Sequence, residues 1–302
     1  MSIIEKAVGR LDANKGVVQR AIEMPAIVAL PIEVQIEPDV ILSAEKGVVS
    51  DDIGKPNLKK IDIDLEQLHR LGMVTPDAAR TSIAEEFRLI KRPLLEKAFG
   101  KNGATIKHGN LIMVTSSVPG EGKTFCAVNL AISIAMELDH TVLLVDADVA
   151  RPSVPRYLQI NPESELSDVG LMDVLLDDKL DLVDAILKTN IDKLSLIRAG
   201  RSHARATELL ASQGMMALLD EISNRYSDRI VIFDSPPLLL TTEAKVLASQ
   251  MGQIVLVVEA EATTQSKVKE VLRQLKSCQN ISLVYNKAKT ISNGEYYGRY
   301  YG

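Results

Sequence analysis

The chain has 302 residues, of which 46% are hydrophobic and 25% charged, with a formal net charge of −5. This composition is ordinary for a globular protein and excludes a largely disordered chain. The negative net charge argues against non-specific nucleic-acid binding, which needs an excess of Lys and Arg. The longest apolar stretch, residues 125–138, is shorter than the ~20 residues of a membrane-spanning helix. We therefore expect a cytoplasmic protein that has no spanning helix of its own.

The first 59 residues differ in pattern from the rest of the chain. Apolar residues recur there at helical spacing: Ile4, Ala7, Val8 and Leu11. This face of an amphipathic helix is expected either to pack internally or to dock on a membrane-protein partner. Prolines and glycines scattered through residues 24–57 indicate a linker. The predicted organisation is an N-terminal helix and flexible linker in residues 1–59, a folded domain in 60–288 and a flexible tail in 289–302.

The central region alternates between helical and extended patterns. A helix is predicted to begin at the cap Ser82, with Glu85 at its third helical position. Six short runs rich in Val, Ile and Leu follow, at residues 111–115, 142–145, 194–197, 230–233, 254–258 and 281–285. Their continuous apolar character predicts strands that are buried on both faces. The expected fold is a three-layer α/β/α sandwich with a mostly parallel sheet.

A glycine-containing loop, residues 116–124, lies between the first of these strands and the following helix. Gly120 and Gly122 allow backbone N–H groups to approach phosphates closely. Lys123 supplies charge for the outer phosphates, and the Thr124 hydroxyl is placed to ligate Mg²⁺. The formal P-loop pattern asks for glycine where Ser117 stands, but the strand-loop-helix context supports a P-loop NTPase domain. We assign ATP contacts to Val118, Pro119, Gly120, Glu121, Gly122, Lys123, Thr124 and Phe125.

Three aspartates follow two of the predicted strands. Asp146 and Asp148 end the second run, and Asp234 ends the fourth. Single aspartates in such places are commonly turn formers, so the assignment depends on all three occurring beside a P-loop. Phosphoryl transfer needs acidic groups at strand ends to hold Mg²⁺ and to polarise the nucleophile. We assign Thr124, Asp146 and Asp234 to the metal, and Lys123, Asp146 and Asp148 to catalysis, with Asp148 accepting the acceptor's proton.

The carboxyl end is rich in tyrosine. Residues 295–302 hold four of the seven tyrosines in the chain: Tyr296, Tyr297, Tyr300 and Tyr301. Interleaved glycines and the nearby terminus disfavour regular structure, so these hydroxyls are candidate phosphoryl acceptors. The alternative is an aromatic tail that docks on the sheet or on a partner.

Together these motifs resemble the bacterial tyrosine autokinases, or BY-kinases, of exopolysaccharide and capsule biosynthesis, over roughly residues 80–302. The P-loop matches the family's Walker A pattern Ser-x-x-Pro-Gly-x-Gly-Lys-[Ser/Thr]. Asp146, Asp148 and Arg151 match its Walker A′ pattern, although two residues separate Asp148 from Arg151 where many members have one. Asp234, followed by two prolines, matches Walker B, and Asn286 resembles the adenine-binding position.

The resemblance implies an ATP- and Mg²⁺-dependent kinase that phosphorylates its own tail. Glu85, Arg88 and Lys91 occupy the family's Glu-x-x-Arg-x-x-Arg helix motif, which mediates ring-like self-association. Lysine in the last place weakens this contact or shifts it to Arg92, since lysine lacks the arginine fork. The alternative is an ordinary solvated helix face.

Two partner proteins of the ring are also implied by the resemblance. They are a separate transmembrane chain-length-determinant protein that activates the kinase, and a phosphotyrosine phosphatase. The first of these would place the kinase at the inner membrane. Residues 2–7 and 86–95 are similar to autokinases that accompany exosortase-linked polysaccharide loci.

Two other functions are compatible with a P-loop. A MinD/ParA-type ATPase switch would carry a signature lysine early in the loop, where this chain has Val118. A non-catalytic nucleotide-gated scaffold would not need the three aspartates together with Lys123. Both hypotheses stay open at this point.

Overall fold

The computed structural model describes residues 59–78, 81–100, 106–160, 169–225 and 228–288. The amphipathic helix and linker expected before residue 59, and the tyrosine-rich tail after residue 288, lie outside the described residues. Within the described ranges, no helix combines the length and the apolar character that crossing a membrane requires.

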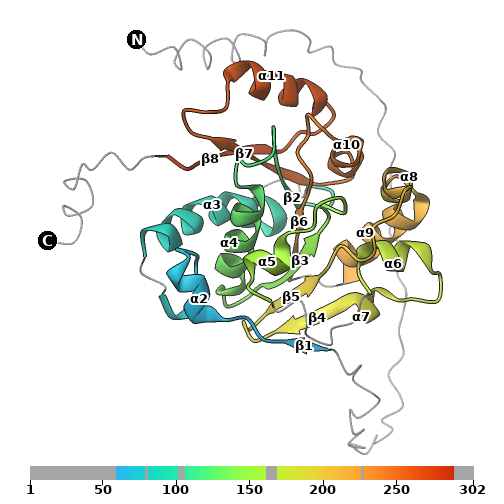
Figure 1. The fold of residues 1–302 in the computed structure, drawn as a ribbon, viewed down its shortest axis with the longest axis horizontal. Coiled ribbons are helices and arrows are strands. Elements are labelled where there is room, and N and C mark those ends of the chain that lie inside the picture. The colour runs from blue at the N-terminus through green and yellow to red at the C-terminus, as the bar shows by residue number, and fades with distance from the viewer. Residues whose placement is uncertain (1–58, 79–80, 101–105, 161–168, 226–227, 289–302) are drawn as a thin grey trace, which may run out of the picture. The chain divides into compact units, whose positions relative to one another are not determined.

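An eight-stranded sheet runs through the described part of the chain in the order β1-β4-β5-β3-β6-β2-β7-β8 (Figure 1). Neighbouring strands are parallel, except for β4 and β5. The strands are β1 Lys60–Ile61, β2 Leu111–Ser116, β3 Thr141–Asp146, β4 Ile186–Thr189, β5 Leu194–Ile197, β6 Arg229–Asp234, β7 Gln253–Glu259 and β8 Ile281–Asn286. All six predicted strands are present, and the mostly parallel α/β fold is confirmed.

Helices cover both faces of this sheet (Figure 1). They are α2 Leu65–Arg70, α3 Ser82–Phe99, α4 Lys123–Ala135, α5 Val154–Tyr157, α6 Leu171–Leu176, α7 Leu182–Ala185, α8 Ala206–Leu210, α9 Gln213–Arg225, α10 Thr242–Ala248 and α11 Gln265–Gln274, with a 3-10 turn at Pro76–Ala78. Alternate residues of β6 enter opposite cores. Ile230 and Ile232 belong to the core cluster that includes residues of α3 and α4, whereas Val231 and Phe233 belong to the cluster that includes residues of α9, α10 and α11. The three predicted layers follow from this alternation.

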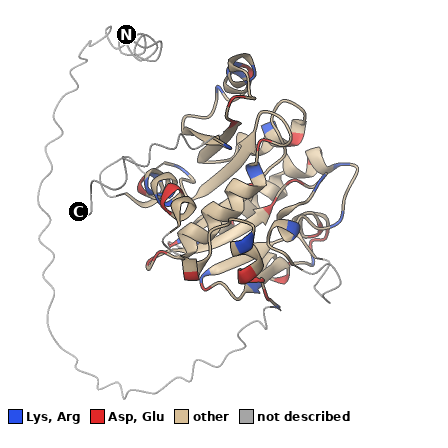
Figure 2. Ribbon diagram, turned by 60° about the vertical axis from the view of Figure 1, so that its left-hand side comes forward, with Lys and Arg blue, Asp and Glu red and all other residues tan. Residues whose placement is uncertain are grey.

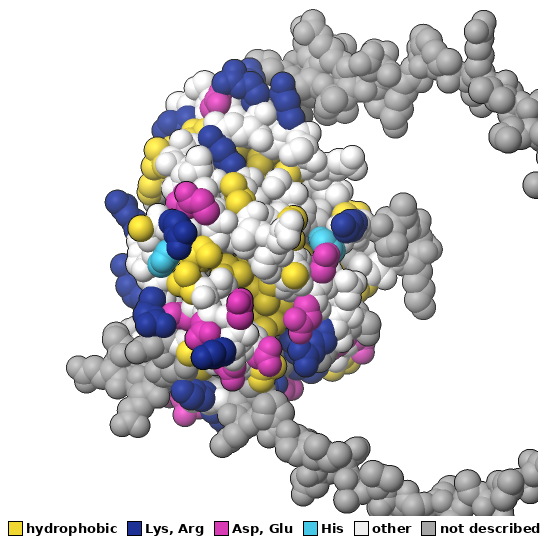
Figure 3. Space-filling model, turned by 90° about the vertical axis from the view of Figure 1, so that its right-hand side faces the viewer, with side chains coloured by type: hydrophobic (Ala, Val, Ile, Leu, Met, Phe, Trp, Pro, Cys, Tyr) yellow, Lys and Arg dark blue, Asp and Glu magenta, His cyan; other side chains and the backbone are white. Residues whose placement is uncertain are grey.

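Charged residues lie mainly on the outer helices and loops, and the central strands carry few of them (Figure 2). On the face seen in Figure 3, basic and acidic side chains are interspersed around hydrophobic ones. The described residues of that face therefore present no broad field of one sign.

Two local expectations are wrong. Helix α3 is capped by Thr81, not Ser82, because the extended backbone of Thr81 lets its hydroxyl accept the Ala84 N–H at 3.3 Å. Strand β8 is not buried on both faces, since Leu283 is 58% and Tyr285 66% exposed. It is the last strand in the described sheet.

Candidate functional site

The phosphate loop joins β2 to α4, and two of its glycines adopt a backbone conformation that other residues rarely adopt. Gly120 and Gly122 have φ angles of 90° and 96°, a region that strongly favours glycine. A Cβ on Gly122 would lie 2.0 Å from the Asn286 amide nitrogen, so any other residue there would have to displace the Asn286 side chain. The loop leads into the N-terminus of α4, where free backbone N–H groups and the helix dipole attract anions.

Side chains from the segment after β7 and from β8 hold this loop in place. The buried Glu121 carboxylate accepts the Val118 N–H at 3.0 Å and the Thr263 hydroxyl. The Asn286 amide donates to the Glu121 carbonyl at 2.9 Å. Glu121 and Asn286, both predicted to contact ATP, therefore have side chains that support the loop itself.

Lys123 connects the loop to the acidic strand ends. Its ammonium lies 2.9 Å from Asp148 Oδ2 and 3.6 Å from Asp234 Oδ1. The Thr124 hydroxyl donates to Asp234 Oδ2 at 2.7 Å. The carboxyl ends of β3 and β6 lie beside one another because these strands pair in parallel, with Asp146 opposite Asp234. The structure thus brings together the predicted lysine, threonine and all three aspartates.

Asp146 is fully buried at the end of β3. Its Oδ2 accepts the backbone N–H groups of Ser153 at 2.9 Å and Val154 at 3.0 Å, at the start of α5. Burial and the charge of Asp234 raise the pKa of Asp146 to about 7, against these two hydrogen bonds. A proton or a cation is therefore needed to neutralise it.

The pKa values of Asp234 and Lys123 are shifted by the same environment. Burial raises the pKa of Asp234 to about 6, although the Lys123 charge opposes this shift. Burial alone would lower the pKa of Lys123, but Asp234 and Asp148 outweigh burial and raise it. One ammonium faces three carboxylates, which leaves the base of the site with an excess of negative charge.

This donor set fits Mg²⁺. Asp234 Oδ1 is buried and accepts no hydrogen bond, its nearest cation being the Lys123 ammonium at 3.6 Å, so this hard oxygen can serve a metal once Lys123 turns to phosphate. Among the described residues, no group of three or more His, Cys, Asp or Glu side chains is arranged to hold a metal alone. Mg²⁺ in phosphoryl-transfer sites commonly takes one or two carboxylates, with phosphate oxygens and water completing its shell.

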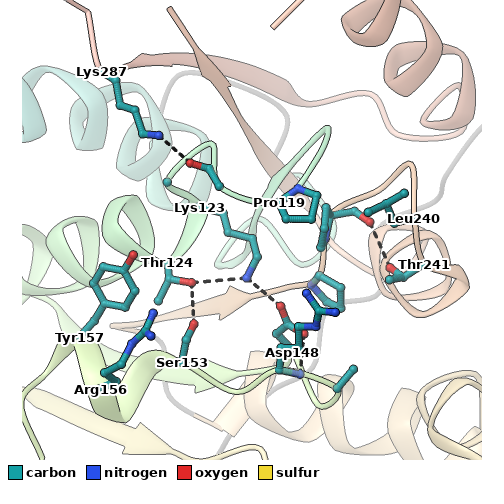
Figure 4. Close-up of a pocket in the computed structure, with 16 residues that line it drawn as sticks. Pro119, Lys123, Thr124, Asp148, Ser153, Arg156, Tyr157, Leu240, Thr241 and Lys287 are labelled. Carbon is teal, nitrogen blue, oxygen red and sulfur yellow. Dashed lines mark hydrogen bonds and ion pairs between the residues drawn. The ribbon is translucent and has the colours of Figure 1, made fainter. Parts of the chain in front are cut away.

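A cavity of about 620 Å³ opens above these groups. Figure 4 shows Lys123 and Asp148 between its two ends, with Tyr157 and Lys287 on one side and Leu240 on the other. Lys287 donates to the Gly120 carbonyl at 2.7 Å. The cavity therefore has room on both sides of the Lys123–Asp148 pair.

Some contributors to the cavity were not predicted. The Ser153 hydroxyl lies 2.9 Å from Thr124 Oγ1. Only the position of Ser153, just after the Walker A′ motif, could have indicated from the sequence that it belongs to the site. Arg156 stacks over the Tyr157 ring at 5.6 Å, and Leu240 lines the far end. No sequence signal marks a leucine as a surface residue of a site.

Phe125 does not place its side chain in the cavity. Its ring packs edge-on against Phe87 of α3, with 6.5 Å between ring centroids. Only its backbone, at the start of α4, is positioned for the predicted ATP contact.

The three predicted self-association residues do not share one surface. Glu85 and Arg88 form an ion pair on the outside of α3. The Lys91 ammonium is buried, donating to the Ser133 carbonyl at 2.5 Å and pairing with Glu137 at 2.7 Å. Lys91 falls on the inward stripe of the helix, which consists of Ala84, Phe87, Lys91 and Leu94. The expectation that Lys91 faces another subunit is corrected accordingly, whereas Arg92 is 71% exposed.

Lys91→Met is expected to destabilise the chain by about 1–3 kcal/mol, because the buried Ser133 carbonyl loses its donor and Glu137 its closest cation. Urea unfolding measures the change. Arg92→Met is the control, since Arg92 lies 3.9 Å from the same Glu137 carboxylate but is exposed. It is expected to cost less than about 0.5 kcal/mol, and equal effects would contradict the buried role of Lys91.

The chain matches the AAA domain family over residues 109–288. The tyrosine-protein kinase YwqD of Bacillus subtilis is 32% identical over 193 residues, which cover 63% of this chain and 77% of that protein. The succinoglycan biosynthesis transport protein ExoP of Rhizobium meliloti is 28% identical, over 79% of this chain but only 30% of its own length. Among solved structures, the BceF tyrosine kinase domain is 26% identical, with a TM-score of 0.55, over 74% of this chain and 90% of that chain.

Proposed function

Because the chain belongs to the bacterial tyrosine kinases, we propose that it transfers the γ-phosphoryl group of ATP to tyrosines of its own tail. One observation carries this proposal: Lys123, Asp148 and Asp234 converge beside the phosphate loop. The acceptors proposed are Tyr296, Tyr297, Tyr300 and Tyr301, which lie outside the described residues.

Different residues of the site are proposed to bind the phosphates and the metal ion and to hold the loop. The loop backbone and Lys123 bind the β- and γ-phosphates. Thr124, Asp146 and Asp234 would hold Mg²⁺, which when bound would neutralise the charge that develops on the phosphoryl oxygens. Asn286 holds the loop through its bond to the Glu121 carbonyl, and we assign the adenine contact to the same residue.

Asp148 is poised to change partners. Its Oδ1 accepts the Arg151 N–H at 3.1 Å, and its Oδ2 pairs with Lys123. When Lys123 turns to the phosphates, Oδ2 becomes available to a tyrosine hydroxyl. The tyrosine oxygen then bonds to the γ-phosphorus, the bond to the β–γ bridging oxygen breaks, ADP leaves, and the phenolic proton passes to Asp148.

The biological setting follows from the relatives. The chain is similar to a succinoglycan biosynthesis transport protein, ExoP. We therefore propose that it regulates the polymerisation and export of an exopolysaccharide. We propose that copies assemble as a ring through Glu85, Arg88 and Arg92 of α3. A separate transmembrane chain-length-determinant protein would activate the ring and keep it at the inner membrane, and a phosphotyrosine phosphatase would reset it. The link to exosortase loci stays a prediction.

Charge explains how modification would regulate the ring. Each phosphotyrosine adds roughly −1.5 to −2 charge to a chain that is already negative. Several on one tail repel each other and the neighbouring subunit, so phosphorylation favours disassembly.

The proposed activity is tested by incubating the full chain with radiolabelled Mg²⁺-ATP, together with the cytoplasmic segment of its membrane partner. Label on tyrosine is expected in the parent chain. It should be absent in Lys123→Met and in a variant with all four tail tyrosines changed to Phe. Phosphate release without protein label would instead indicate an ATPase switch, and no turnover would indicate a scaffold.

A further inference from the structure

We propose that Thr263 is a positioning residue for ATP binding. It acts through the buried carboxylate of Glu121, which sets the conformation of the phosphate loop. Thr263 lies in the turn between β7 and α11, residues 260–263, and belongs to none of the Walker motifs. The inference rests on the proposed function, because it concerns how the same loop binds the phosphates of ATP.

Glu121 is an unexpected residue in a loop that binds polyphosphate, because a carboxylate that faced the cavity would repel the phosphates. Its neighbours Gly120 and Gly122 line the cavity, as do Pro119 and Lys123, whereas Glu121 does not. Glu121 is instead 1% exposed. The phosphate-binding conformation of the loop therefore requires that this carboxylate stay buried outside the cavity.

A backbone N–H and a hydroxyl hold the Glu121 carboxylate in place. Its Oε2 accepts the Val118 N–H at 3.0 Å, and its Oε1 accepts the Thr263 hydroxyl. Thr263 Oγ1 also accepts the Glu259 N–H at 3.1 Å, so the hydroxyl proton is directed to Glu121. A buried carboxylate that loses a donor is destabilised. Without the Thr263 hydroxyl, we expect the carboxylate to move towards water and the phosphate loop to move with it.

The turn that carries Thr263 is fixed to the end of β7, as precise positioning requires. The Thr263 N–H donates to the Glu259 carbonyl at 3.1 Å. A second connection to the phosphate loop runs through Lys287, whose ammonium pairs with the Glu259 carboxylate at 3.1 Å and donates to the Gly120 carbonyl at 2.7 Å. Because the Lys287 side chain is 48% exposed, we expect the contact of Thr263 with the buried Glu121 to contribute more.

The test measures the affinity of the full chain for a fluorescent ATP analogue in the presence of Mg²⁺. Thr263→Val removes the hydroxyl with little change in volume, and it is expected to weaken binding about tenfold, as the loss of a hydrogen bond to a charged group predicts. In the labelling assay the KM for ATP should rise equally, with kcat within threefold of the parent value. Thr263→Ser keeps the hydroxyl, and its affinity should stay within twofold of the parent.

Thr264→Val is the matched control. The Thr264 hydroxyl caps α11 and bonds to Ser266 and Lys267 of that helix instead of to the phosphate loop. Loss of the cap should lower the melting temperature but leave the affinity for the analogue within twofold of the parent.

A double variant tests whether Thr263 acts through Glu121. Glu121→Ala should weaken binding at least as much as Thr263→Val. Adding Thr263→Val to Glu121→Ala should then change the affinity less than twofold, because the hydroxyl no longer has a carboxylate to hold.

Each other outcome decides a point. Unchanged affinity in Thr263→Val, a loss of equal size in Thr264→Val or Thr263→Ser, or a further tenfold loss in the double variant overturns the role of Thr263. The expected losses of affinity in a chain that never labels tyrosine refute the kinase proposal and leave the role of Thr263 standing. A parent chain that binds no ATP analogue overturns both.

Discussion

Asp148→Asn is expected to slow tyrosine phosphorylation by about 10²–10⁴-fold, the usual loss when a general base is removed. ATP affinity is expected to stay the same or increase. In the described structure Lys123 is paired with Asp148 at 2.9 Å, so the carboxylate competes with phosphate for the ammonium. An amide nitrogen in its place would release Lys123 to the nucleotide.

Two measurements separate these effects: labelling rates with the peptide of residues 289–302, and titration with a fluorescent ATP analogue. Asp139→Asn is the matched control, because it removes the same charge from an exposed position and should alter neither quantity. A phosphorylation rate within threefold of the parent would eliminate Asp148 as the proton acceptor.

The parallel core could be predicted because its strands are buried on both faces. Continuous runs of Val, Ile and Leu, such as 230–233, have no other easy explanation. The two strands that were missed lack this signal. β1 has two residues, and β4 includes the exposed Lys188 and follows α7 without a break. Short strands of this kind are specified by the strands they pair with more than by their own composition.

The candidate site was predictable where chemistry constrains residue type. Lys123, Thr124 and the three aspartates are required by phosphate and metal, and parallel pairing brings the strand ends together. Lys91 shows the opposite case. A lysine spaced like a surface motif points inward because Ser133 and Glu137 of the α4 region satisfy its ammonium. Only tertiary contacts reveal such a partner.

Asp146→Asn is expected to abolish Mg²⁺ binding and at the same time to stabilise the metal-free chain at pH 8. The pKa of Asp146 is about 7 in the folded state, against about 3.9 when unfolded. Between these values the folded state holds the extra proton, so stability is greatest near pH 4 and falls as the pH rises towards 7. The difference amounts to about 4 kcal/mol at most. Thermal unfolding in EDTA between pH 5 and 8 should show this slope in the parent and a flatter one in the variant.

Asp173→Asn should behave in the opposite way, which makes it a sharp control. Asp173 is also buried, but bonds from Arg201 and Gly170 outweigh burial and lower its pKa. Its contribution is present above the unfolded pKa and is lost as the pH falls, so its removal destabilises the chain at pH 8. If Asp146→Asn were equally destabilising, Asp146 would be a structural carboxylate like Asp173. If Asp146→Asn instead stabilises the metal-free chain, the Asp146 charge weakens the fold. Binding of a cation would then explain why the chain retains this carboxylate.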